Sequence, residues 1–136
     1  QGLWLKGTLH INTAPIANAD SYSVDTAATT TIGNVLANDT DTDGNALSVL
    51  GIETSQTRGY VTDNGDGTFE YNANRAFGYL DETQTAIDRF FYRASDGGTG
   101  SNLTTVTITV HGTRPAILPL DGIFRGSNIT DKQSQE

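Results

Sequence analysis

The chain has 136 residues, enough for one domain with its own core, and its 16 acidic and 8 basic side chains give a net charge of −8. This negative charge argues against nucleic acid as a partner, because phosphates would be repelled. The chain has no cysteine, which excludes disulfides and thiolate metal sites. No apolar run approaches membrane-spanning length, and Gln1 does not begin a signal-peptide pattern.

Short extended segments separated by turns make up most of the chain. The predicted strands cover residues 20–24, 29–37, 47–53, 59–62, 68–72, 88–95 and 104–110. The run DNGDG at residues 63–67 predicts a hairpin turn, since Asn-Gly and Asp-Gly tolerate a positive φ. Residues 104–110 alternate between threonine and branched apolar side chains, which predicts one buried and one wet face. About seven strands at this spacing predict an all-β sandwich.

The remaining segments carry weaker signals. Residues 74–88 form a long connection in which we expect one helical turn at most. Phe69 and Tyr71 share a face of their strand and are expected in the core. Phe91 should face opposite to Phe90 and Tyr92, which leaves it exposed or covering the second sheet.

The most unusual segment is ANDTDTDGNAL, residues 37–47, in which Asp39, Asp41 and Asp43 stand on alternate positions before Gly44. Calcium takes six to eight oxygen ligands, and such a string supplies three carboxylates and a sharp turn. The helical calcium hand would need Glu at position twelve, where this chain has Leu50, so that motif is excluded. A solvated turn is the alternative, because repulsion of about 1 kcal/mol per pair is tolerable in water. Both interpretations remain open at this point.

Five segments in order carry a family resemblance: NTAPIANADSY, VLANDTDTDGNAL, NGDGTFEYN, DRFFYRASDGG and TVTITVHGT. Residues 14–112 thereby resemble the bacterial cadherin-like and VCBS-type repeats of large surface and secreted proteins. The resemblance implies an Ig-like, cadherin-like Greek-key β-sandwich over residues 14–113 that binds Ca²⁺ near one pole. Residues 1–13 would be a lead-in linker or the end of a preceding segment, and residues 114–136 a polar, flexible tail.

The resemblance also implies a set of calcium ligands. The candidate metal ligands are Asp39, Asp41, Asp43, Asn38, Asp88, Asp25 and Asp96. Asp39 and Asp41 match the family's D-x-D, and Asp88 lies in its acidic-Arg segment. Asp96 falls in the matching S-D-G turn, where a turn aspartate is the alternative, and Asp20 is either a ligand or a strand-edge charge.

The linkers depart from the family pattern. Arg114 stands where the closing linker usually has Asn and Asp, and Thr13 stands where the opening linker usually has Asp. An arginine would repel the ion, so we do not expect interdomain calcium at the C-terminal end.

No set of residues predicts catalysis, since His10 and His111 both lie at domain edges and no hydrolase or phosphate-loop motif is present. We therefore expect a calcium-binding module of an exported bacterial protein, secreted or at the cell surface. It would serve adhesion or act as a stiffened spacer, with a cell-surface or matrix component as partner. The alternative is a carbohydrate-binding module, with Trp4, Tyr60, Tyr79 and Phe91 stacking on sugar rings of a polysaccharide. Homophilic contact through a sheet edge is a third hypothesis.

Overall fold

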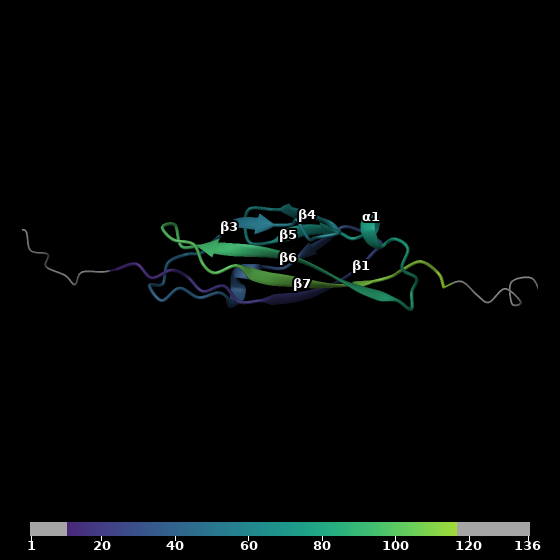
Figure 1. Ribbon diagram of the computed structural model, residues 1–136, viewed down its shortest axis with the longest axis horizontal. Coiled ribbons are helices and arrows are strands. Elements are labelled where there is room, and N and C mark those ends of the chain that lie inside the picture. Colours follow the sequence, from purple (N-terminus) through teal and green to yellow (C-terminus); the bar gives the residue numbers. More distant parts are fainter. Residues whose placement is uncertain (1–10, 117–136) are drawn as a thin grey trace, which may run out of the picture.

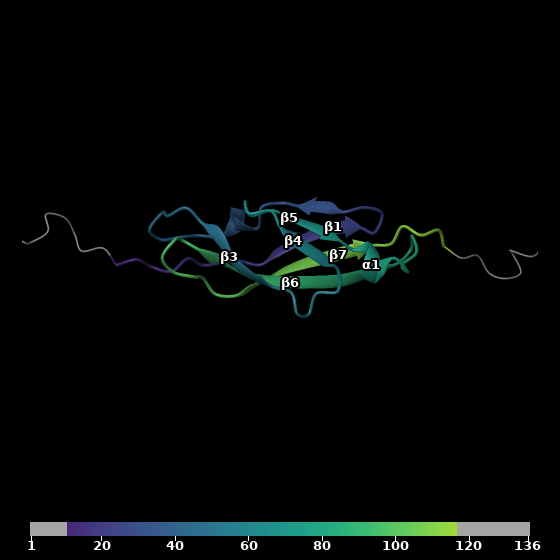
Figure 2. The ribbon, with the colours of Figure 1, turned by 90° about the horizontal axis from the view of Figure 1, so that it is seen from above.

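The computed structural model describes residues 11–116, which form two β-sheets packed face to face (Figures 1 and 2). In chain order the elements are β1 (Asp20–Asp25), β2 (Thr30–Ile32), the 3-10 helix η1 (Val35–Asn38), β3 (Ser48–Glu53), β4 (Tyr60–Asp63), β5 (Phe69–Asn72), the short helix α1 (Asn74–Phe77), β6 (Thr85–Ser95) and β7 (Thr104–His111). One sheet has the order β1-β7-β6-β3 and the other the order β2-β5-β4. This arrangement confirms the predicted cadherin-like β-sandwich.

The long antiparallel pair of β6 and β7 forms the spine of the four-stranded sheet, and β1 lies parallel to β7 on its other side. Asp20 is therefore beside Val106 and Asp25 beside His111, so the two ends of β1 point to opposite ends of the molecule. Figures 1 and 2 show the described chain entering at one end of an elongated body and leaving at the other. We call these ends the N-terminal pole and the C-terminal pole.

The core lies between the sheets and is filled by the inward-facing side chains of their strands. Val106, Ile108 and Val110 of β7 are fully buried, whereas the threonines between them are half-buried, as the alternation predicts. Phe69 of β5 meets Phe90 of β6 edge to face, with 5.0 Å between the ring centroids. Burying one such ring stabilises the fold by about 1.5–3 kcal/mol.

The predicted hairpin at residues 63–67 is confirmed and joins β4 to β5. Gly65 has φ 88° and Gly67 φ 91°, a region that other residues rarely adopt. The predicted helical turn within residues 74–88 is the four-residue α1.

The single extended segment predicted over residues 29–37 is wrong. The strand ends at Ile32, and the chain turns into η1, where the Asn34 side chain accepts a hydrogen bond from Leu36 N at 3.0 Å. Asn34 is thus an N-cap, and capping redirects the chain toward the acidic loop. Strand β6 also begins earlier than predicted, at Thr85, because it continues to pair with β7 as far as His111.

Within residues 11–116, no helix is both long and apolar enough to cross a membrane. Most of the predicted lead-in and tail lies outside the described residues, and so does Trp4.

Candidate metal site at the N-terminal pole

The acidic loop between η1 and β3 forms a tight turn at the N-terminal pole. Asp43 N donates to Asp41 Oδ1 at 2.7 Å, and Gly44 N donates to Asp41 O at 3.0 Å with Gly44 at φ 77°. The Asp41 side chain thus closes an Asx turn by accepting a bond from the backbone two residues further on. Asp39, Asp41 and Asp43 are nevertheless all half-buried, so they do not simply project into water.

The segment by which the chain enters the domain lies against this loop. Ile16 and Thr40 exchange two backbone hydrogen bonds, of 2.8 and 3.0 Å. Thr13 N donates to Asp43 Oδ2 at 2.6 Å, and Asn18 N donates to Asp39 Oδ1 at 2.8 Å. The carboxylates of the loop therefore hold residues 13–18 at the pole through main-chain amides.

Beneath the loop, two carboxylates converge on the hydroxyl of Tyr92. This hydroxyl lies 2.6 Å from Asp39 Oδ2, 2.8 Å from Val35 O and 3.3 Å from Asp20 Oδ2. Burial, and after it the charge of Asp39, raises the pKa of Asp20 to about 6. Burial and the neighbouring carboxylates also raise the pKa of Tyr92. Asp20 and Asp39 share this hydroxyl, and their further donors, the Asn38 side chain and Asn18 N, are neutral groups, so the cluster keeps a surplus of negative charge.

One carboxylate oxygen of the acidic loop lacks a partner in the described part of the chain. Asp41 Oδ2 is buried, and within residues 11–116 it has no hydrogen-bond partner. A buried carboxylate oxygen without a donor or a cation costs free energy, and native proteins leave few such atoms. A hard cation that prefers carboxylate oxygens would remove this cost.

Asp96 joins the same pole from the turn after β6. Its carboxylate accepts bonds from Thr99 N at 2.7 Å, Gly98 N at 2.8 Å and Asn12 Nδ2 at 2.8 Å. These donors, with Thr99 N the strongest, hold the pKa of Asp96 well below its usual range. Asp96 is thus a turn aspartate that also anchors the entry segment. Among residues 11–116, no group of three or more Asp, Glu, His or Cys side chains is arranged so that it could hold a metal ion.

The structure does not bring Asp88 and Asp25 to the acidic loop. Asp88 is 3% exposed in the middle of β6, where it accepts hydrogen bonds from Arg58 N, Gly59 N and the hydroxyl of Tyr71. Asp25 ends β1 beside His111, at the C-terminal pole, and is exposed.

At the C-terminal pole lies Arg114, at the linker position where the resemblance led us to expect Asn and Asp. Its guanidinium donates to Tyr79 O from Nη2 at 2.6 Å and from Nε at 3.2 Å. Arg114 O in turn accepts from Glu82 N at 2.7 Å. The Arg114 guanidinium therefore fixes the outgoing chain at this pole.

The predicted sugar-binding aromatics are spread over the surface. Tyr60 on β4 is 63% exposed and Tyr79 after α1 is 57% exposed, whereas Phe91 on β6 is half-buried. The sequence analysis placed Tyr92 on the strand face opposite to Phe91 but did not predict its contact with Asp39, because the two residues are 53 positions apart. The signal that could have found this contact is the tyrosine hydroxyl itself, which needs a partner when it is buried.

The chain belongs to the bacterial cadherin-like domain family, whose model matches residues 12–112. Members of this family are non-catalytic modules that occur in surface or secreted proteins. No curated protein matches the chain. One solved structure with a weak likeness is a nucleoside hydrolase-related hypothetical protein from Saccharophagus degradans that is associated with carbohydrate metabolism. It is 9% identical with a TM-score of 0.45, and the match covers 75% of this chain and 26% of that one.

Proposed function

We propose that this chain is a calcium-binding cadherin-like module and that the ion binds at the N-terminal pole. The observation that supports this proposal most strongly is the buried Asp41 Oδ2, which has no hydrogen-bond partner within residues 11–116. It is accompanied by the surplus negative charge where Asp20 and Asp39 share the hydroxyl of Tyr92. Calcium would supply the positive charge that this pole lacks.

The residues that would hold the ion are the carboxylates of Asp39, Asp41 and Asp43 together with the side-chain oxygen of Asn38. Asn38 Nδ2 donates to Ala19 O at 3.0 Å, which leaves its Oδ1 as an acceptor. Calcium needs six to eight oxygens, so main-chain carbonyls and water would supply the rest.

The consequence of binding would be mechanical. Because the loop already holds residues 13–18 through main-chain amides, an ion there would stiffen the junction at which the chain enters the domain. Such a module would act as a spacer or in adhesion to a cell-surface or matrix component. Occurrence of the family in surface and secreted proteins supports an exported location.

The experiment is thermal and denaturant unfolding in EDTA and in about 10 mM calcium. With a dissociation constant of about 0.1 mM, binding should add about 2.7 kcal/mol to the free energy of unfolding. The double variant Asp39→Ala/Asp41→Ala should lose this increment. The matched control, Asp63→Ala/Asp66→Ala, removes two aspartates from the β4–β5 turn and should keep it. Equal unfolding curves of the wild-type protein in EDTA and calcium would refute the proposal.

A second function, carbohydrate binding, is favoured by one observation. The exposed Tyr60 ring borders a surface pocket of about 450 Å³, and exposed aromatic rings beside pockets are suited to stack on sugars. A glycan array probed in calcium tests this function, with Tyr60→Ala expected to lose the signal and Tyr79→Ala to keep it. An array that is blank across all glycans would remove this candidate.

A further inference from the structure

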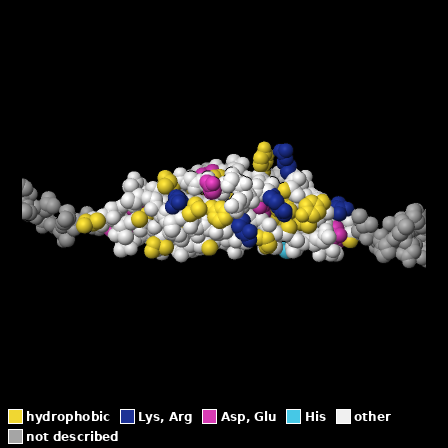
Figure 3. Space-filling model, in the orientation of Figure 1, with side chains coloured by type: hydrophobic (Ala, Val, Ile, Leu, Met, Phe, Trp, Pro, Cys, Tyr) yellow, Lys and Arg dark blue, Asp and Glu magenta, His cyan; other side chains and the backbone are white. Residues whose placement is uncertain are grey.

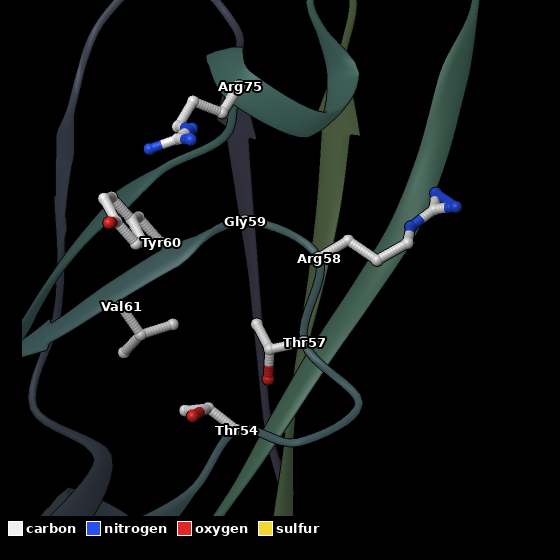
Figure 4. A pocket seen from close by; sticks show the side chains of 7 residues that line it. All are labelled: Thr54, Thr57, Arg58, Gly59, Tyr60, Val61 and Arg75. Atoms are coloured by element: carbon white, nitrogen blue, oxygen red, sulfur yellow. The ribbon is translucent and has the colours of Figure 1, made fainter.

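The pocket beside Tyr60 lies between strand β4, helix α1 and the loop that joins β3 to β4 (Figure 4). Tyr60, Val61 and Arg75 form one side of it, and Thr54 and Thr57 form the other. The Arg75 guanidinium carbon is 5.3 Å from the centroid of the Tyr60 ring, so the cation and the ring are held as one unit.

The position of this pocket is set by the buried carboxylate of Asp88. Asp88 accepts bonds from Arg58 N and Gly59 N, and so fixes the end of the β3–β4 loop against β6. The Thr57 hydroxyl donates to Arg89 O at 2.8 Å, which fixes the middle of the same loop. Arg58 and Arg75 both line the pocket, but the Arg58 guanidinium lies over the Phe77 ring at 4.4 Å, whereas that of Arg75 lies beside Tyr60 (Figure 4).

The charge of the pocket is opposite to that of the chain as a whole. None of its lining residues is acidic, although acidic side chains outnumber basic ones two to one in the sequence. Figure 3 shows Lys and Arg side chains spread along one face of the molecule, among hydrophobic side chains and a few acidic ones. Within residues 11–116 every basic Lys or Arg position is an arginine: Arg58, Arg75, Arg89, Arg93 and Arg114. The arginines that line the pocket attract an anion, because arginine recognises carboxylate and sulfate through paired N–H groups.

We propose that this pocket binds an acidic saccharide unit, a sugar that carries a carboxylate or a sulfate. Arg75 binds the anionic group, the exposed Tyr60 ring packs on the apolar face of the sugar, and the Thr54 and Thr57 oxygens bind its hydroxyls. A ring, a cation and two hydroxyls suit a charged sugar better than an acidic peptide, which has no pyranose face for Tyr60. This inference rests on the proposed carbohydrate-binding function and narrows it to acidic glycans.

The test is a calorimetric titration of the chain in EDTA, so that the calcium proposal has no bearing on the outcome. The probes are oligogalacturonate for carboxylate, an oligomeric dextran sulfate for sulfate, neutral dextran and polyglutamate. We expect binding to one or both acidic saccharides and none to dextran or polyglutamate. Arg75→Gln and Tyr60→Ala should each weaken it about tenfold, the loss of one charged contact or one stacked ring. Arg93→Gln, which removes an equal charge outside the lining of this pocket, should leave affinity unchanged.

The outcomes separate the inference from the function on which it rests. Binding to dextran that Tyr60→Ala removes but Arg75→Gln spares would keep carbohydrate binding and overturn the acidic class. Equal binding to polyglutamate would overturn the saccharide and leave a general anion site. No binding to any probe in this set would overturn the inference itself. Equal weakening by Arg93→Gln and Arg75→Gln would show that net charge, rather than this pocket, carries the affinity.

Discussion

The buried Asp88 and the aspartates of the N-terminal pole differ in how their carboxylates are hydrogen-bonded. Asp88, in the middle of β6, is buried with three N–H or O–H donors around it, and it ties the β3–β4 loop to the sheet. At the N-terminal pole, Asp41 Oδ2 is also buried but has no partner within residues 11–116, and Asp20 and Asp39 compete for one hydroxyl. A carboxylate whose donors come from its own fold is a structural anchor, whereas one short of donors is a candidate ligand. Sequence patterns alone treat the two alike.

The largest expected effect comes from removing the Asp88 carboxylate, which anchors the β3–β4 loop. Asp88→Ala removes the acceptor of two backbone amides and the Tyr71 hydroxyl and should lower the free energy of unfolding by about 3 kcal/mol or more. Denaturant unfolding measures this loss, with exposed Asp25→Ala as a control expected to change it by less than about 0.5 kcal/mol. An equal loss of stability in Asp25→Ala would contradict the anchoring role of Asp88.

The same anchor can be disturbed without touching a carboxylate. A Cβ on Gly59 would meet the hydroxyl and ring of Tyr71, so Gly59→Ala should push Tyr71 away from Asp88. We expect a loss of about 2 kcal/mol in the free energy of unfolding, as for other overpacked sites. Gly51→Ala is the matched control, because a Cβ there meets nothing within 4 Å. A Gly59→Ala protein as stable as wild type would contradict the close approach.

The third prediction concerns the surplus charge of the pole. The pKa of Asp20 is raised to about 6 from 3.8, so between these values the folded chain holds a proton that the unfolded chain has lost. Stability without calcium should therefore fall as the pH rises through this range. Asp20→Asn should gain about 1 kcal/mol in EDTA at pH 7.5, since solvent screening reduces the full effect of the shift, and should gain nothing below pH 3.8. Unfolding curves at both pH values measure this difference, and a loss of stability at pH 7.5 would contradict it.

The smallest effect is expected at the C-terminal pole. Arg114→Gln loses an exposed charged contact to Tyr79 O and should cost about 0.5 kcal/mol. The increment that calcium adds should not change, because the proposed site lies at the other end of the molecule. A calcium increment lowered by Arg114→Gln would show that the two poles are coupled, and unfolding in EDTA and calcium measures both quantities.

Local signals predicted those parts of the fold that are locally determined. The glycines of DNGDG require positive φ and produced the expected β4–β5 turn, and the alternation from Thr104 to Val110 gave β7 its buried face. The 3-10 helix η1 was missed, because Asn34 caps a turn that apolar β-branched residues on either side conceal. The early start of β6 depends on pairing with β7, which no window of β6 alone contains.

In the candidate site, too, sequence analysis found the residues of one continuous stretch and missed contacts between distant parts of the chain. The acidic loop is one continuous stretch, so its three aspartates could be found by spacing. The partners of Asp88 are backbone amides 30 and 29 positions away, and backbone groups leave no mark on residue identity. A buried aspartate on a strand next to arginine therefore looked like a family ligand, although its oxygens bind the protein's own amides.

The central claim is that the pole with the orphan carboxylate binds the calcium ion, and a crystal structure grown in calcium tests it most directly. We predict anomalous density for one ion bonded to Asp41 Oδ2, with Asp39 or Asp43 among its other ligands and with Asp88 still bonded to Arg58 N and Gly59 N. A structure in which the Asp41 side chain points into bulk solvent, with no ion at the N-terminal pole, would contradict the account.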